Sequence, residues 1–186
     1  MKHMIQINEL LGNRMCVKIL QHFVDHPTTE LGFRQLKKEL DVAPATLAKG
    51  LEMLERKNLI THRQLGNMKP YKFQRENPLA KQFKILRVIE ELLPFEKIGT
   101  NFDCHIYLFG SRARGEDTEQ SDVDLLIIAE QKHSEIQGTM EREKKKMKRL
   151  AVSPFNIYIF TNLEWADMAR KDPAFYERVE KDKVNL

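Results

Sequence analysis

The feature that most constrains the fold is an alternating strand pattern that runs directly into a glycine and a serine. Residues 104–109, Cys-His-Ile-Tyr-Leu-Phe, alternate between the two faces of a strand, and Gly110 and Ser111 follow at once. A glycine at the end of a strand, followed by a hydroxyl and the start of a helix, leaves backbone N–H groups aimed at one point. The pattern predicts a phosphate site. Arg112 and Arg114 could add positive charge to this site, or their side chains could simply be solvated.

Two carboxylates stand at the start of the next strand pattern, residues 121–128. Because side chains alternate along a strand, Asp122 and Asp124 are expected on one face, with Val123 and Leu125 on the other. Carboxylates about 7 Å apart on one strand repel each other unless a charge neutralises them. A divalent cation removes that repulsion, and oxygen ligands suit Mg²⁺. The alternative is that both carboxylates face solvent, although the apolar run after them is typical of an interior strand.

Gly110-Ser111, ten further residues and Asp122-Val123-Asp124-Leu125 together resemble the signature of the DNA polymerase β-like nucleotidyltransferases, and most closely the minimal nucleotidyltransferases of prokaryotes. The resemblance covers about residues 98–186 and implies a small α/β domain with a mixed sheet. It implies transfer of a nucleoside monophosphate from an NTP to a hydroxyl with Mg²⁺ or Mn²⁺. The site residues that it implies are Asp122 and Asp124 as catalytic metal ligands, and Gly110 and Ser111 for the nucleotide. Arg112 and Arg114 are added to the nucleotide site by their positions after the bend.

The pattern departs from the family at a third carboxylate. Members that catalyse carry it on the strand that here corresponds to residues 154–160, yet no Asp or Glu lies between Ala151 and Leu163. By alternation Asn156 or Tyr158 stands at the expected position, and Asn156 is the better match. An amide oxygen ligates a metal weakly and cannot serve as a base. The sequence therefore predicts a nucleotide site that lacks the third carboxylate needed for turnover.

The remainder of the C-terminal half has the sequence signals of a helix, then a strand, then a final helical segment. The strand is expected over 155–161, and Thr161 with Glu164 forms a capping-box pattern that opens the last segment. Asp172-Pro173 is a further helix start. The helix before the strand is indicated by its spaced apolar residues: Ile136, Met140, Met147 and Leu150.

The front half reads as three helices and a hairpin. Apolar residues recur at helical spacing over 16–24, 33–40 and 44–54, and Pro44 opens the third of these helices. Two β-prone runs, 59–65 and 68–73, then flank Gly66-Asn67, which is a hairpin signal.

This order of elements resembles the winged helix-turn-helix family over residues 10–75. In that family the third helix enters the major groove and the hairpin rests on the phosphate backbone. The resemblance implies that Ala45, Thr46 and Lys49 face base edges or phosphates, and that Arg63 and Lys69 touch the backbone. The same fold also serves for dimerisation or protein docking, and that alternative stays open.

Gly50 stands in the middle of the third helix of this half, where a glycine costs about 1 kcal/mol relative to alanine. It is expected to mark a close approach by another backbone.

Between the halves, apolar residues at helical spacing predict a connector helix within residues 78–97. We therefore expect an α+β protein with a winged helix-turn-helix over 1–77, the connector, and a nucleotidyltransferase-like domain over 98–186. The connector could join the two modules rigidly or pair with a second copy in a homodimer.

Charge is unevenly distributed and favours a polyanionic partner for the front half. Residues 1–78 hold 13 Lys and Arg against 8 Asp and Glu, whereas the remainder is close to neutral. Cys16 and Cys104 lie in separate apolar segments, which favours buried thiols over a disulfide. Without an apolar run long enough to span a bilayer, or a leader pattern, we expect a cytoplasmic protein.

Three functions remain open at this stage. The first is a nucleotidyl-transferring enzyme, and the second is a double-stranded DNA-binding regulator that keeps an impaired transferase domain as a nucleotide sensor. The third follows from the resemblance alone, because small transferases of this type often act as the antitoxin of a toxin–antitoxin pair with a helical nuclease toxin.

Overall fold

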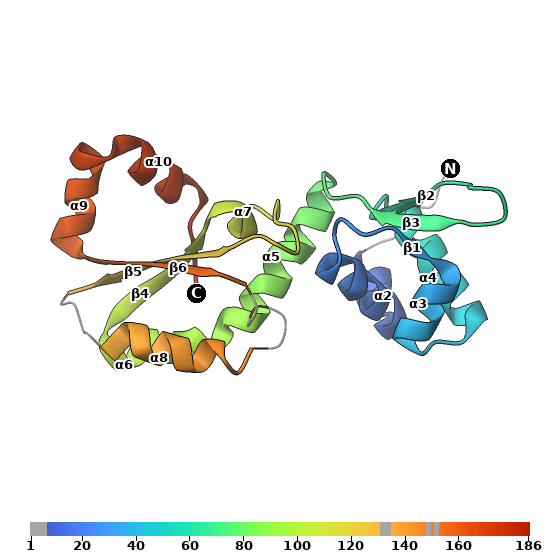
Figure 1. Ribbon diagram of the computed structural model, residues 1–186, viewed down its shortest axis with the longest axis horizontal. Coiled ribbons are helices and arrows are strands. Elements are labelled where there is room, and N and C mark those ends of the chain that lie inside the picture. Colours follow the sequence, from blue (N-terminus) through green and yellow to red (C-terminus); the bar gives the residue numbers. More distant parts are fainter. Residues whose placement is uncertain (1–6, 131–134, 148–149, 151–152) are drawn as a thin grey trace. The chain divides into compact units, whose positions relative to one another are not determined.

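The computed structural model describes residues 7–130, 135–147, 150 and 153–186 and divides the chain into two compact units (Figure 1). The first unit spans Met1–Phe83 and the second Lys84–Leu186. Separate hydrophobic cores form in the two units. No helix in the described ranges is long and apolar enough to cross a membrane.

The first unit combines helices with a small antiparallel sheet. Its helices are α1 (Ile7–Leu11), α2 (Arg14–Asp25), α3 (Phe33–Leu40) and α4 (Pro44–Arg56). Its strands are β1 (Leu31–Gly32), β2 (Ile60–His62) and β3 (Pro70–Phe73), in the order β1-β3-β2. The three helices and the hairpin expected from the sequence are present. Helix α1 and strand β1 were not predicted, because elements of five and two residues are too short to show a period.

Local hydrogen bonds explain where these elements begin and turn. The Asn13 side chain accepts two backbone N–H groups at the start of α2, and Pro44 occupies the first turn of α4. Between β2 and β3, Leu65 and Met68 exchange backbone hydrogen bonds of 2.9 Å, and Gly66 has a φ of +56°. A glycine adopts that left-handed conformation without strain, so the hairpin turns where predicted.

Helix α4 packs closely on α2 at Gly50. Gly50 is buried, and a methyl group at this position would collide with the fully buried side chain of Ile19. The close approach predicted from Gly50 is therefore real, but the neighbour is a side chain and not another backbone. The glycine is explained by packing inside the first unit.

The connector is part of both units. Helix α5 (Pro78–Leu92) places Ala80 in the core of the first unit and Val88 in the core of the second. The boundary between the two units falls after Phe83, within this helix. A 3₁₀ turn, η1 (Leu93–Phe95), and a helix that we did not predict, α6 (Glu96–Phe102), follow it.

The second unit is built on a mixed four-stranded sheet in the order β6-β5-β4-β7. The strands are β4 (Cys104–Phe109), β5 (Val123–Ala129), β6 (Phe155–Thr161) and β7 (Val184–Asn185). Strand β5 pairs in parallel with β6 and antiparallel with β4, and β7 adds antiparallel to the free edge of β4. The expected mixed sheet is confirmed, with β7 as a two-residue addition.

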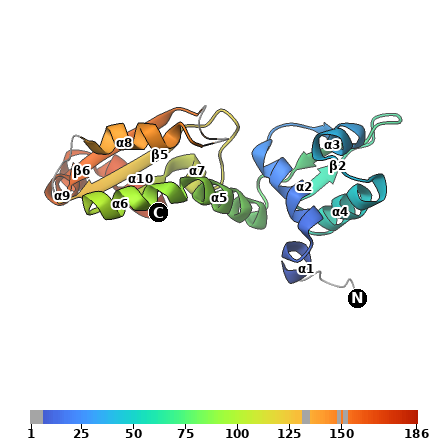
Figure 2. The same ribbon diagram turned by 90° about the horizontal axis from the view of Figure 1, so that it is seen from below.

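Helices cover both faces of this sheet (Figure 1). Helices α6 and α8 (Glu135–Lys144) lie side by side on one face, as the view from below shows (Figure 2). Helices α9 (Asn162–Lys171) and α10 (Pro173–Asp182) lie over the other. The predicted capping box at Thr161 is present, so α9 begins where the sequence placed it.

Helix α8 is shorter than predicted. It ends at Lys144, before Met147 and Leu150, although both of these side chains still pack in the core. Backbone hydrogen bonds of the i to i+3 type at Lys146 and Met147 close the helix, and basic side chains are favourable at a helix C-terminus.

Candidate functional site

The register of the sheet brings both predicted aspartates to one place. Asp124 on β5 lies opposite Asn156 on β6 and Phe109 on β4, and Asp122 directly precedes β5. Neighbouring strands are about 4.8 Å apart, so side chains in register on one face meet. The site is therefore assembled from the start of two parallel strands and the end of a third.

The amide of Asn156 joins the two carboxylates. Its Nδ2 donates to Oδ1 of Asp124 at 2.8 Å and to Oδ2 of Asp122 at 3.2 Å. Asp122 is exposed and Asp124 is half-buried, so the cluster lies at the surface of the unit. Oxygens from two different carboxylates thus surround a single hydrogen-bond donor.

The glycine-serine bend lies against this cluster. Gly110 has a φ of +77°, and a methyl group on it would collide with the carboxylate of Asp124. Only glycine fits both the conformation and the space. Helix α7 (Gly110–Ala113) begins here, which places Ser111 in the turn beside the carboxylates.

Arg112 does not face a phosphate, which corrects the role predicted for it. Its side chain is 1% exposed, and its guanidinium donates to the Asp117 carboxylate at 3.2 Å, the backbone carbonyl of Asp122 at 2.9 Å and Oγ of Ser153 at 3.1 Å. The sequence could not show this, because the inward direction of a side chain in a one-turn helix depends on the tertiary packing. Arg112 instead fixes the loop that carries Asp122.

A second buried cation completes this network. Nζ of Lys84 lies 2.9 Å from Oδ1 of Asp117, and both side chains are at most 2% exposed. Neither Lys84 nor Asp117 was predicted from the sequence. One signal was available, since Lys84 falls midway between Ala80 and Val88 on the apolar stripe of α5, where a lysine must find a buried partner.

Arg114, also predicted to bind the nucleotide, is paired with two carboxylates. It lies 2.9 Å from Glu116 and 2.7 Å from Asp182, and the hydrogen bonds that its guanidinium donates to these two carboxylates raise the pKa of the guanidinium. Its charge thus ties α7 to the end of α10. The structure places Arg114 near the bend, but its charge already has partners.

The donor set around Asn156 suits a hard divalent cation. Asp122 and Asp124 supply carboxylate oxygens of the kind that Mg²⁺ and Mn²⁺ prefer, whereas Asn156 directs its amide nitrogen, which is not a metal ligand, toward them. Within the described ranges, no group of three or more His, Cys, Asp or Glu side chains could hold a metal ion. A metal ion at this cluster would be held by Asp122, by Asp124 and by the phosphate oxygens of a bound nucleotide.

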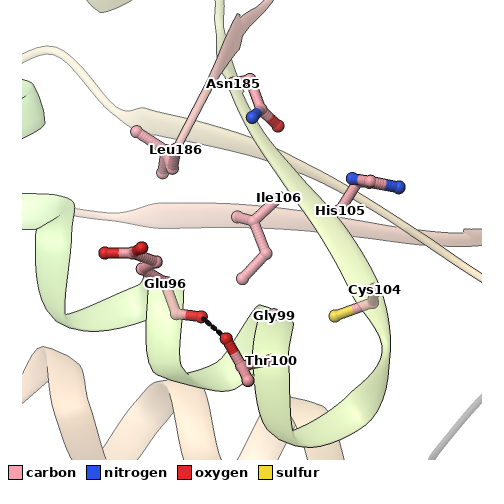
Figure 3. Close-up of a pocket in the computed structure, with 8 residues that line it drawn as sticks. All are labelled: Glu96, Gly99, Thr100, Cys104, His105, Ile106, Asn185 and Leu186. Carbon is pink, nitrogen blue, oxygen red and sulfur yellow. Dashed lines mark hydrogen bonds between the residues drawn. The ribbon is translucent and has the colours of Figure 1, made fainter.

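A separate cavity of about 240 Å³ opens at the other end of β4 (Figure 3). Glu96, Thr100 and Cys104 contribute to its wall, and burial raises the pKa of the Cys104 thiol. None of the predicted site residues lines this cavity. Cys104 is the first residue of β4 and the carboxylate cluster lies at its last, so the two places are distinct.

In the first unit, the residues predicted to touch DNA lie on one helix and the hairpin. Ala45, Thr46 and Lys49 are exposed on α4, and Lys69 is exposed beside the hairpin turn. Arg63 is also exposed, but its guanidinium lies 2.8 Å from Glu30.

Comparison with known protein families places part of the chain in a family. The model of the nucleotidyltransferase domain matches residues 84–184, which is more than half of the chain. The match begins earlier than the expected boundary at residue 98 and takes in the second half of α5, including Lys84. Neither the search of curated proteins nor the search of solved structures gave a match.

Proposed function

Because the chain belongs to the nucleotidyltransferase domain family, we propose that its second unit binds a nucleoside triphosphate with Mg²⁺ or Mn²⁺ and transfers the nucleoside monophosphate to a hydroxyl, with pyrophosphate as the leaving group. The observation that supports this most directly is the meeting of Asp122 and Asp124 at one point beside Gly110.

In this proposal each residue of the cluster has a separate task. Asp122 and Asp124 hold the cation, and the Ser111 hydroxyl with the backbone N–H groups after Gly110 holds the phosphates. When bound, the metal polarises the phosphoryl group that is attacked. Arg112 acts indirectly, since it holds the backbone of Asp122 in place.

A second candidate is favoured by one observation, the amide at position 156. Asn156 contacts both carboxylates but cannot accept a proton from an attacking hydroxyl. A domain of this kind would bind the nucleotide without turnover and report its presence, as in a nucleotide-sensing or antitoxin-type regulator.

For the first unit we propose a winged helix-turn-helix that binds double-stranded DNA. Exposure of Ala45, Thr46 and Lys49 on α4 is compatible with contacts in the major groove, and Lys69 with a contact to the backbone. Arg63 would exchange its partner Glu30 for a phosphate. The alternative occupants of this surface are a second copy of the chain or a helical toxin.

Transfer can be tested with α-labelled NTPs and Mg²⁺, with label sought on protein and on RNA. The wild-type chain is expected to give label, and Asp122→Asn and Asp124→Asn to abolish it without a change in side-chain volume. Asp167→Asn on α9, whose partner is the exposed Arg170, serves as the matched control and should label like the wild type.

The same assay separates the two candidates when it is combined with equilibrium binding. Binding of MgATP without label, lost in Asp124→Asn, would select the nucleotide sensor. Absence of both binding and label in the wild-type chain would refute the nucleotide site itself.

A further inference from the structure

An aromatic cluster continues from the carboxylates along the same face of the sheet. Tyr158 follows Asn156 by two residues on β6, so its side chain lies on the same face, about 7 Å further along the strand. Phe109 directly precedes Gly110 and lies opposite Asp124 in the register. The rings therefore border the carboxylate site from two strands.

The rings of Tyr158, Phe109 and Phe175 contact one another. The centroid of Tyr158 is 5.7 Å from that of Phe109 and 5.4 Å from that of Phe175 on α10, and Phe109 and Phe175 are 6.0 Å apart in an edge-to-face arrangement. Spacings of this size are those of favourable aromatic pairs. Phe109 and Phe175 thus support Tyr158 from within the unit.

Tyr158 is the most exposed ring of the cluster. Its side chain is 38% exposed, whereas Phe109 is 4% and Trp165 6% exposed. Phe175 is half-buried and has the guanidinium of Arg178 over its ring at 5.6 Å. A flat ligand that approaches along the sheet from the carboxylates would meet the ring of Tyr158 first.

We propose that Tyr158, supported by Phe109 and Phe175, is the stacking surface for the nucleobase of the nucleotide bound at Gly110, Asp122 and Asp124. The inference rests on the proposed function, and it adds how the base is held. The base is joined to the α-phosphate through one sugar, so a ring one strand repeat from the carboxylates is within its reach. Stacking uses the π-face that every base has, so the site accepts purines and pyrimidines alike.

The test compares a nucleotide with a ligand that has the phosphates but no base. Affinities of the full-length chain for MgATP and for magnesium tripolyphosphate are measured by calorimetry, in the wild type, Tyr158→Ala and Tyr158→Phe. Tyr158→Ala is expected to bind MgATP about tenfold more weakly, because stacking on one base is worth roughly that much. Its affinity for tripolyphosphate should be unchanged, and Tyr158→Phe, which keeps the ring, should bind both ligands like the wild type.

The possible results are distinct. Unchanged binding of MgATP by Tyr158→Ala overturns the stacking surface and leaves the nucleotide site intact. An equal loss for MgATP and tripolyphosphate also overturns it, because the substitution then acts on the phosphate site. Failure of the wild-type chain to bind either ligand would instead reject the proposed function itself.

Discussion

The guanidinium of Arg112 holds together three segments of the second unit. It links α7 to the loop at Asp117, to the backbone of Asp122 and to Ser153 just before β6. With Lys84 on the other side of Asp117, two buried cations share one carboxylate. Such a network fixes geometry at the cost of desolvation, and loss of Arg112 removes both an ion pair with Asp117 and the donor to the Asp122 carbonyl and the Ser153 hydroxyl.

We therefore expect Arg112→Met to lower the free energy of unfolding by about 3 kcal/mol, the usual effect of breaking a buried ion pair from one side. Urea denaturation measures it. Arg170→Met, which breaks an exposed pair with Asp167, is the matched control and should leave the stability unchanged. Equal stability of the two variants would show that Arg112 does not hold the loop.

The two candidate functions differ in what is expected of residue 156, where an amide nitrogen stands in place of a carboxylate oxygen. Replacement by Asp substitutes an oxygen for the amide nitrogen that now bridges Asp122 and Asp124. In Asn156→Asp we expect a lower Tm without metal, because three carboxylates repel one another, and about tenfold tighter Mg²⁺ binding, because affinity follows the charge of the ligands.

The label-transfer rate of Asn156→Asp should also rise, since the new carboxylate can accept a proton. Asn101→Asp on α6 adds the same charge away from the site and should bind Mg²⁺ like the wild type. A Tm and a Mg²⁺ affinity that match those of Asn101→Asp would argue against a metal at this cluster.

At the scale of elements, the contact of α2 with α4 depends on a missing side chain. Gly50 allows α4 to lie against Ile19, and both positions are buried. Elsewhere in a helix, alanine would be preferred to glycine. Here the packing outweighs the helix propensity.

Gly50→Ala is accordingly expected to destabilise the first unit by about 1–3 kcal/mol, the usual cost of overpacking a core. Ile19→Val removes the methyl group that the new side chain would meet and by itself costs about 1 kcal/mol. The double variant should be more stable than the sum of the two effects predicts, and thermal or urea unfolding of all four chains measures the coupling. Strict additivity would contradict the contact.

Elements with strong local signals were predictable, and short ones were not. The helices opened by Pro44, by the Thr161 capping box and by Asp172 begin where the sequence places them, because caps act within a few residues. Strands β1 and β7 have two residues each and exist only because a neighbouring strand pairs with them.

At the scale of the whole molecule, the excess of positive charge and the carboxylate cluster belong to different units. The first 78 residues hold the excess of Lys and Arg, while the carboxylate cluster lies in the second unit. The proposed DNA contact should therefore depend on salt through the first unit alone.

We expect the affinity for duplex DNA to fall with rising salt concentration. The joint substitution Lys49→Glu with Lys69→Glu should reduce the slope of log K against log salt by about 1.8, which corresponds to the loss of two phosphate contacts. Fluorescence anisotropy at several salt concentrations gives the slope. Lys171→Glu with Lys181→Glu changes the net charge equally in the second unit and should leave the slope as it is. If the control pair lowers the slope as much as the first pair, the contact is not made by α4 and the hairpin.

The sequence alone determined the order of the main elements and the residues around which a site could form, because strand alternation, helix caps and turn residues act over a few neighbours. It also placed Asp122, Asp124 and Asn156 on one face of their strands. The tertiary structure decided what depends on register and burial: the amide between the two carboxylates, the contacts of the inward-pointing Arg112 with Asp117 and Ser153, and the pairing of Asp117 with Lys84. Those contacts join segments up to 41 residues apart, and no local pattern records which of two arginines will point inward.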